Sequence, residues 1–195
     1  MTVMVVLIIL AYLLGSVPSG YLLGKAVGID VRRVGSGNIG ATNVARAIGK
    51  RQGIVTLIAD AAKGFLPVLA GIHLDFEPAA LAGIAAAAFV GHIYPLFLKF
   101  RGGKGVATAL GALLALAPLA TLVLATLFGL VAFTSRIVSL SAMTAALAAP
   151  FVLWLFYQPP PVIGLGFFYA GLIVMRHHDN IARLRAGTEP RFGEH

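Results

Sequence analysis

The chain contains no cysteine and few charged residues. Disulfide bridges and cysteine-ligated metal sites are therefore excluded. Charged side chains make up 11% of the sequence and hydrophobic residues 59%, with a mean hydropathy of +0.93. Soluble domains contain only about 45–50% apolar residues. This composition predicts an all-α fold, a polytopic helical membrane protein.

Acidic residues are scarce: seven Asp and Glu stand against fifteen Lys and Arg, for a formal net charge of +8. On a soluble protein such an excess would suggest nucleic acid. In a lipid-soluble chain it is better explained by topology and by contact with anionic headgroups. We therefore expect the lipid bilayer as partner, no nucleic acid, and no obligate protein partner.

The first apolar stretch lacks the marks of a cleaved signal peptide. No basic segment precedes Val3, and the stretch continues through Gly15 to Lys25 without a small-residue cleavage site. We interpret it as a retained transmembrane helix. The helix is locally weakened by four residues within this stretch: Ser16, Pro18, Ser19 and Gly20.

Hydrophobic runs divide the rest of the chain. They lie at 3–24, 54–72, 79–98, 106–134, 137–157 and 162–175. The run at 106–134 contains Pro118 and is interpreted as a helical hairpin, which gives about seven transmembrane helices. Its first half, 106–117, would cover about 18 Å, short of the roughly 30 Å hydrocarbon core, and is either a distorted span or re-entrant. No linker or repeat is evident, so 1–195 is expected to be a single integral membrane domain.

Basic residues set the expected orientation. They cluster in the 25–53 loop, in the 99–105 loop and after residue 175, whereas the connectors 73–78 and 158–161 contain no Lys or Arg. The positive-inside rule then predicts an outside N-terminus and a cytoplasmic C-terminus. Lys63 alone lies within a span, three residues after Asp60, and the two can neutralise one another. Whether this pair is purely structural or also shapes a site is left open.

A glycine-rich polar segment, GSGNIGATNVAR at 35–46, stands out in this apolar chain. It matches G-x-G-x-x-G, but a dinucleotide site is rejected because no strand precedes it. If residues 41–48 are helical and end at Gly49, then Thr42, Asn43 and Arg46 share a face suited to phosphate. The competing interpretation is a flexible loop whose charge only sets topology.

Two further segments carry chemistry-bearing residues. In GHIYPLFLKFRGGKGVAT at 91–108, glycines surround Lys104, so the ammonium and backbone N–H groups could converge on an oxyanion. In RHHDNIARL at 176–184, His177 and Asn180 share a helical face. Ser139 and Ser141 lie at the start of a span, where they line a pocket or bond to their own helix. The alternative for the segment at 91–108 is a loop whose positive charge only sets topology, and the alternative for 176–184 is a solvated tail. Two adjacent histidines, 177 and 178, could suggest metal, but no carboxylate at a suitable spacing supports a metal site.

Taken in order, these three segments, with GSVPSGYLLGK at 15–25 and DAAKGFLPV at 60–68, resemble the bacterial acyl-phosphate:glycerol-3-phosphate acyltransferase family. The resemblance covers essentially the whole chain. It implies transfer of a fatty acyl group from acyl phosphate to the sn-1 hydroxyl of glycerol 3-phosphate, giving lysophosphatidic acid and inorganic phosphate without a cofactor. It also implies a bacterial cytoplasmic membrane location with the active site facing the cytoplasm.

The resemblance assigns roles to the matching positions. Lys104, Arg46 and His177 are the expected catalytic residues, with Lys104 as the main stabiliser of transition-state charge. The expected substrate-binding residues are Ser36, Gly37, Asn38, Thr42, Asn43, Gly102, Gly103, Ser139, Ser141 and Asn180.

A general base is not evident. The His-x-x-x-x-Asp motif of other glycerophosphate acyltransferases is absent, because no Asp lies five residues after any of the histidines 73, 92, 177 and 178. We hypothesise that a substrate phosphate oxygen accepts the proton. The main alternative is a transporter of a phosphorylated small anion, although the inverted repeat common among transporters is not found. A non-catalytic membrane scaffold would leave the glycines around Lys104 unexplained.

Overall fold

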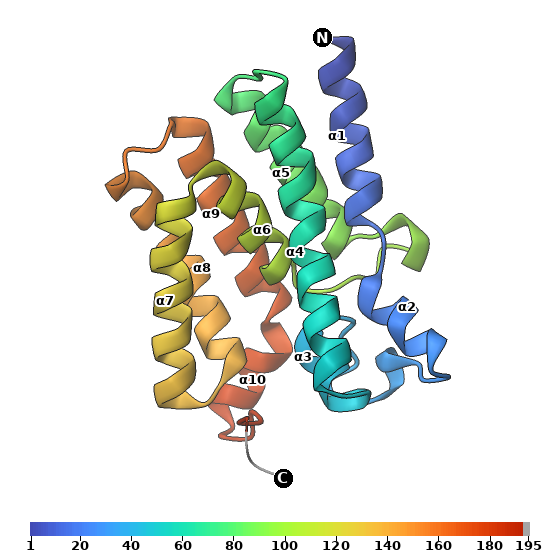
Figure 1. The fold of residues 1–195 in the computed structure, drawn as a ribbon. Coiled ribbons are helices and arrows are strands. Elements are labelled where there is room, and N and C mark those ends of the chain that lie inside the picture. The colour runs from blue at the N-terminus through green and yellow to red at the C-terminus, as the bar shows by residue number, and fades with distance from the viewer. Residues whose placement is uncertain (193–195) are drawn as a thin grey trace. The chain divides into compact units, whose positions relative to one another are not determined.

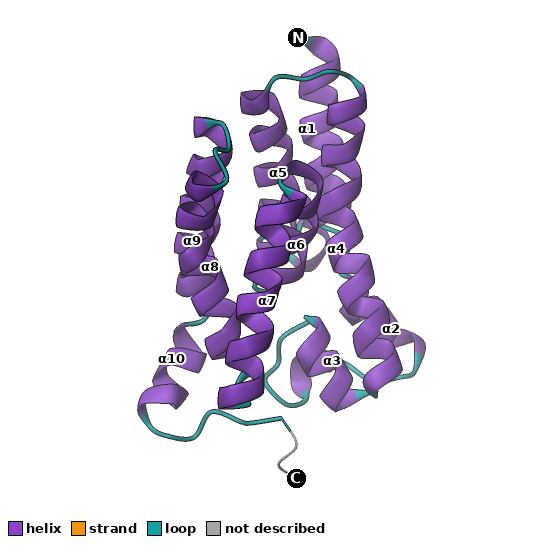
Figure 2. Cartoon of the chain, turned by 60° about the vertical axis from the view of Figure 1, so that its left-hand side comes forward, coloured by secondary structure: helices purple, strands orange, loops and turns teal. Residues whose placement is uncertain are grey.

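The structure, a computed structural model, describes residues 1–192. Figure 2 shows that these residues form helices and loops, with no strand among them. The all-α prediction is confirmed for this part of the chain. The elements are α1 (Thr2–Gly15), α2 (Ser19–Ala26), η1 (Val31–Arg33), α3 (Ala41–Ala47), α4 (Lys50–His73), α5 (Pro78–Ile93), η2 (Leu96–Leu98), α6 (Val106–Leu116), α7 (Pro118–Ser135), α8 (Val138–Leu155), α9 (Pro160–Arg176) and α10 (His178–Arg185).

Five helical segments within the described residues are long and apolar enough to cross a membrane: 2–26, 50–73, 78–98, 118–135 and 138–155. The apolar helices α6 and α9 are shorter. α6 ends at Leu116 and α7 begins at Pro118, which confirms the break expected near that proline. At 11 residues, α6 rises only about 17 Å. The count of about seven spans and the orientation of the termini stay predictions.

The chain divides into two compact units, Met1–Leu116 and Ala117–His195. In the first unit, α4 packs against α1, α2, α3, α5 and α6 (Figure 1). In the second, α8 packs against both α7 and α9, and α10 follows α9. The expectation of a single domain stays a prediction, and each unit is described by itself.

Small residues let the helices of the first unit approach closely. A Cβ atom on Gly64 would collide with the Thr108 carbonyl oxygen on α6, and one on Gly111 would collide with the Ala61 carbonyl oxygen on α4. Gly15 lies in the same way against Ala88, where α1 packs on α5. Without a hydrophobic driving force in lipid, such close backbone packing is a main source of helix association.

The first apolar stretch is two helices, α1 and α2, separated at Ser16–Pro18. Pro18 cannot donate a backbone hydrogen bond, so the helix is interrupted at the weak position that the sequence indicated. The break is buried in protein, with Ser16 fully buried. Irregular backbone at membrane depth is tolerated where protein surrounds it in this way.

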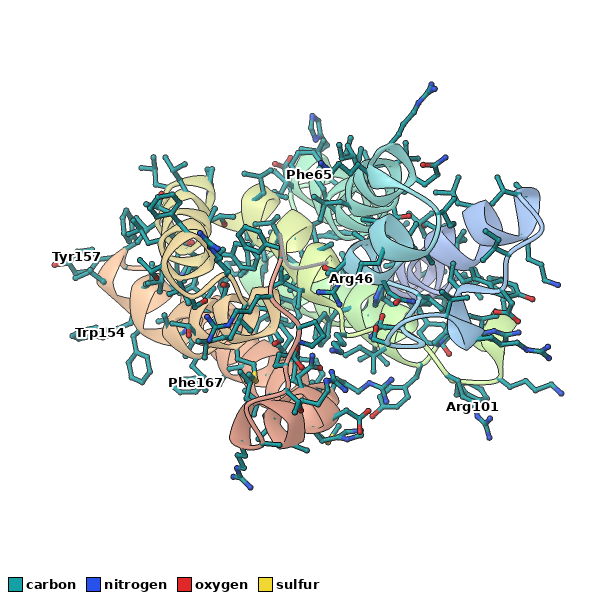
Figure 3. The ribbon with its side chains drawn as sticks, turned by 90° about the horizontal axis from the view of Figure 1, so that it is seen from below. Arg46, Phe65, Arg101, Trp154, Tyr157 and Phe167 are labelled. Carbon is teal, nitrogen blue, oxygen red and sulfur yellow. The ribbon has the colours of Figure 1, made fainter. Side chains whose placement is uncertain are left out.

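The second unit carries aromatic side chains on its outer surface. Trp154, Tyr157 and Phe167 extend away from the ribbon in Figure 3 and are 68%, 95% and 57% exposed. Tyr157 lies in the connector between α8 and α9. Tyr and Trp favour the level of the lipid headgroups, which suits the end of a span.

Candidate active site

Asn43 organises the glycine-rich segment at 35–46. Its buried side chain sits on α3 and accepts a hydrogen bond through Oδ1 from the Ser36 backbone N–H at 2.9 Å. Its Nδ2 atom lies 2.9 Å from the Val31 carbonyl oxygen, 3.1 Å from that of Val34 and 2.8 Å from that of Asn38. One amide therefore ties the whole loop to α3, and the direct contact with phosphate expected of Asn43 stays a prediction.

The loop leads into α3 much as the sequence indicated. Asn38 Oδ1 accepts from the Gly40 N–H at 2.8 Å, and α3 runs over Ala41–Ala47 with Gly49 beyond it at a φ of +143°. Gly37 also has a positive φ, +69°, which favours glycine at that turn. Thr42 and Arg46 are exposed on this short helix, and Figure 3 labels Arg46. Both side chains are thus accessible to a solute.

A small apolar cluster joins the first motif to the second. Val31, Ile39 and Val44 are buried together, and Leu98 packs against them. Leu98 ends η2, the short turn that precedes the glycines around Lys104. Two segments separated by about fifty residues in the sequence, each predicted to bind phosphate, therefore lie side by side in the first unit.

The glycines before Lys104 fold back onto the end of α5. The Gly102 N–H donates to the Ile93 carbonyl at 3.0 Å, and the Gly103 N–H donates to the His92 carbonyl at 3.2 Å. Both groups cap the C-terminal carbonyls of α5. These two N–H groups therefore bond within the fold, and the convergence of the loop around Lys104 on an oxyanion stays a prediction.

Close approach explains why glycine occupies these positions. A Cβ atom on Gly103 would collide with His92 Nε2, and one on Gly102 would collide with the His92 carbonyl oxygen. Gly105 lies against the Phe89 ring at a φ of +80°. Lys104, half-buried between these glycines, leads directly into α6. The first backbone hydrogen bond of α6 runs from the Ala109 N–H to the Gly105 carbonyl at 2.8 Å, so the N–H groups of its first turn add a positive dipole beside Lys104.

The basic loop before the first motif is held by local pairs. Arg32 contacts Asp30 at 2.7 Å, and its hydrogen bond holds the pKa of the Asp30 carboxyl well below its usual range. The same pair raises the pKa of Arg32. The Arg32 guanidinium carbon lies 4.5 Å from the centre of the Tyr21 ring. Arg32 therefore has a structural role in this loop, because its charge is paired with Asp30 and stacked on Tyr21.

In the second unit, a carboxylate that the sequence did not single out lies at the centre of the predicted site residues. Glu189 accepts from Ser139 Oγ at 2.6 Å, from Asn180 Nδ2 at 2.5 Å and from Arg183 Nε at 2.7 Å. Burial raises the pKa of the Glu189 carboxyl, but these three donors outweigh it and lower the pKa overall. Ser139 and Asn180 are thus brought together by Glu189, and their role in binding substrate stays a prediction.

The remaining predicted residues of this unit differ in their surroundings. Ser141 Oγ donates to the carbonyl of Ile137 in its own helix at 2.9 Å, one of the two outcomes considered for it. His177 is 3% exposed, and its Nδ1 atom lies 2.7 Å from the Ile173 carbonyl oxygen. A carbonyl partner requires Nδ1 to carry a proton, which places the lone pair of a neutral ring on Nε2.

Metal ligation receives no support from the described residues, in which no group of three or more His, Cys, Asp or Glu side chains could hold an ion. The donors that gather are basic, amide and hydroxyl groups, a set that suits phosphorylated anions. A family model described as glycerol-3-phosphate acyltransferase matches residues 5–187. The chain belongs to this acyltransferase family.

Curated members of the glycerol-3-phosphate acyltransferase family match along the full chain. The protein of Geotalea daltonii is 50% identical over 192 residues, which is 98% of this chain and 99% of that protein. The one of Geobacter metallireducens is 51% identical over 192 residues with the same coverage. The resemblance drawn from the three motifs is therefore confirmed at the level of the family.

Among solved structures, the chain is similar to PlsY (YgiH), an integral membrane glycerol 3-phosphate acyltransferase. The glycerol 3-phosphate form matches with a TM-score of 0.95 and 41% identity, over 97% of this chain and 96% of that one. The lysophosphatidic acid form gives a TM-score of 0.92 and 40% identity. The chain therefore shares its fold with an integral membrane glycerol 3-phosphate acyltransferase.

Sequence reasoning about this family member missed two features. Glu189 was overlooked because a lone acid in a short tail shows nothing of its partners, of which Ser139 lies 50 residues away. The inward use of the Gly102 and Gly103 N–H groups was missed because a glycine pattern does not reveal which way the backbone turns. In both cases the deciding contact is made with a distant part of the chain.

Proposed function

We propose that this protein transfers a fatty acyl group from acyl phosphate to the sn-1 hydroxyl of glycerol 3-phosphate at the cytoplasmic face of a bacterial inner membrane. The observation that carries the proposal is the near-identical fold of an acyltransferase whose structures hold glycerol 3-phosphate and lysophosphatidic acid. Two adjacent basic segments in the first unit suit a reaction between two phosphorylated substrates.

The reaction needs no redox step and no cofactor. The hydroxyl oxygen of glycerol 3-phosphate attacks the acyl carbon, the bond from that carbon to the phosphate oxygen breaks, and inorganic phosphate leaves. The hydroxyl proton passes to a phosphate oxygen of the substrates. Because phosphate is a good leaving group, correct orientation and charge stabilisation supply much of the rate enhancement.

We assign Lys104, Arg46 and His177 as the catalytic residues. Lys104, preceding the positive end of α6, stabilises negative charge on the phosphate that leaves. Arg46 is exposed on α3 and is free of the Asp30 pairs that hold Arg32 and Arg33. Its guanidinium can therefore bind a phosphate in bidentate geometry. His177 orients glycerol 3-phosphate through Nε2.

The substrate-binding residues act in two ways. Ser36, Gly37, Asn38 and Thr42 contact phosphate directly, whereas Asn43 holds their loop in shape. Gly102 and Gly103 bring the Lys104 backbone close to α5. Ser139 and Asn180 bind glycerol phosphate, with Glu189 fixing their orientation. Ser141 helps shape the start of α8.

The test uses the purified full-length protein in lipid, supplied with acyl phosphate and glycerol 3-phosphate. We expect equal amounts of phosphate and lysophosphatidic acid. Lys104→Met should lower kcat by about 100- to 1,000-fold, as removal of a transition-state donor does. Lys99→Met is the matched control, because Lys99 is exposed and should be dispensable.

Two outcomes would overturn the proposal. Acyl transfer from an acyl thioester but not from acyl phosphate would assign a different donor. Movement of a phosphorylated anion into liposomes, with no product formed, would instead identify a transporter.

A further inference from the structure

Three polar side chains are buried in the interior of the first unit. Asp60 and Lys63 lie on α4 and His92 near the end of α5, and all three are 4% exposed or less. The Lys63 ammonium lies 2.7 Å from Asp60 Oδ1, and the same oxygen lies 3.8 Å from His92 Nδ1. Ionisable residues within membrane-spanning helices are energetically expensive, and their presence usually marks a function.

These side chains connect segments that are far apart in the sequence. Lys63 Nζ donates to the Val17 carbonyl at the break between α1 and α2, at 2.6 Å. On the other side of the pair, the His92 ring presents its Nε2 atom to the Cα of Gly103, so closely that a Cβ atom there would collide with it. The His92 carbonyl also receives the Gly103 N–H at 3.2 Å.

A second set of bonds holds the same segment from α1. Tyr12 donates its hydroxyl to the Tyr94 carbonyl at 2.9 Å, and the Leu96 N–H donates to Ser16 Oγ at 3.3 Å. The chain from residue 94 to residue 103 is therefore fastened at its start by α1 and at its end by His92. Lys104 is the next residue along the chain.

We propose that Asp60, Lys63 and His92 are positioning residues that fix the backbone of Gly103 and thereby the Lys104 ammonium. Lys63 holds Asp60, the Asp60 carboxylate lies beside the His92 ring, and the ring forms the surface against which Gly103 packs. This role rests on the proposed function of Lys104. It differs from simple support of the fold, because its effect passes through one loop.

The test compares a double variant, Asp60→Asn with Lys63→Met, in the wild type and in a Lys104→Met background. Removing both charges together avoids leaving one buried charge without its partner, the change that destabilises most. Asp75→Asn is the matched control, since Asp75 is exposed in the connector between α4 and α5. Thermal unfolding in detergent verifies that each variant is folded.

We expect the double variant to lower kcat by about 10- to 100-fold, the loss that a small misplacement of a catalytic group causes, with little change in KM. In the Lys104→Met background the same change should alter kcat by less than about twofold, because residues that act as a unit are non-additive. His92→Ala should show the same pattern. It should lower kcat by about 10- to 100-fold in the wild type and change it by less than about twofold in the Lys104→Met background.

The proposal is overturned if the folded double variant keeps full activity, or if its loss is as large without the Lys104 ammonium as with it. Loss of folding in the double variant would transfer the test to Gly103→Ala, which adds no buried charge and moves the loop away from His92. These results are separate from the proposed function, which fails if the wild-type protein forms no lysophosphatidic acid from acyl phosphate and glycerol 3-phosphate.

Discussion

Asn43 Oδ1 accepts a hydrogen bond from the Ser36 backbone N–H at 2.9 Å. Through this bond a side chain of α3 sets the shape of a loop that begins seven residues earlier. The loop has little secondary structure of its own, so the amide substitutes for a hydrogen-bonded ladder. Buried backbone groups that lose such a partner are costly to the folded state.

Replacement of Asn43 by alanine should therefore lower both stability and activity. The carbonyls of Val31, Val34 and Asn38 lose their shared donor, and each carbonyl left without a partner costs about 1–3 kcal/mol. The free energy of unfolding, measured with denaturant in detergent, should fall accordingly. Gln158→Ala, which removes an amide with one 3.3 Å contact, is the control and should change it by less than about 0.5 kcal/mol. An equal loss in both variants would contradict this role.

The close crossing of α4 and α6 predicts a second stability effect. Gly111→Ala places a methyl group against the Ala61 carbonyl oxygen, so the helices must separate. Overpacking of this kind costs about 1–3 kcal/mol and should lower the unfolding temperature. Gly129→Ala on α7 meets no atom within 4 Å and should be neutral or slightly stabilising, because alanine favours helix. Comparable unfolding temperatures for the two variants would show that the crossing is not tight.

Glu189 predicts a pH dependence of stability. Its pKa in the folded protein lies below the ordinary value of 4.5, so it contributes stability above that pH and loses the contribution as pH falls through the lower folded value. The wild type should therefore lose stability on acidification more steeply than Glu189→Gln. Unfolding temperatures recorded between about pH 6 and pH 3 measure the difference. Asp179→Asn, at an exposed carboxylate, should leave the wild-type slope unchanged.

The substrate-assisted mechanism predicts a particular response at His177. His177→Gln removes the ring that contacts the Ile173 carbonyl and should raise KM for glycerol 3-phosphate. If the ring only orients the substrate, the pH profile of kcat keeps its shape, whereas removal of a general base eliminates the acidic limb and lowers the rate by about 100- to 10,000-fold. Steady-state kinetics from pH 5.5 to 9 separate the two results. A missing limb would identify His177 as the base.

The sequence predicted the features that depend on local pattern. α3 begins at Ala41, as expected, and the helix break falls at Pro118 because proline cannot continue the hydrogen-bonded ladder. Motif order also indicated the family correctly. These features follow from periodicity and from backbone limits that each residue carries wherever it lies.

Other features depend on contacts between distant segments and could not be predicted. The glycines at 102 and 103 are consistent with N–H groups that face a ligand or with N–H groups that cap α5, and only the fold distinguishes the two. Similarly, Asp60 and Lys63 were predicted to pair from their spacing, but their link to His92 depends on how α4 and α5 pack. Long-range geometry thus decides which groups are available for chemistry.

The contact between Lys63 and the Val17 carbonyl has a consequence for biogenesis. The break in the first apolar segment emerges from the ribosome 46 residues before the lysine that contacts it. Until α4 is inserted, that carbonyl lacks its cationic partner in an environment with no water to replace it. The hydrogen bonding of this break is therefore complete only once α4 packs beside it, so the two segments depend on one another for their assembly.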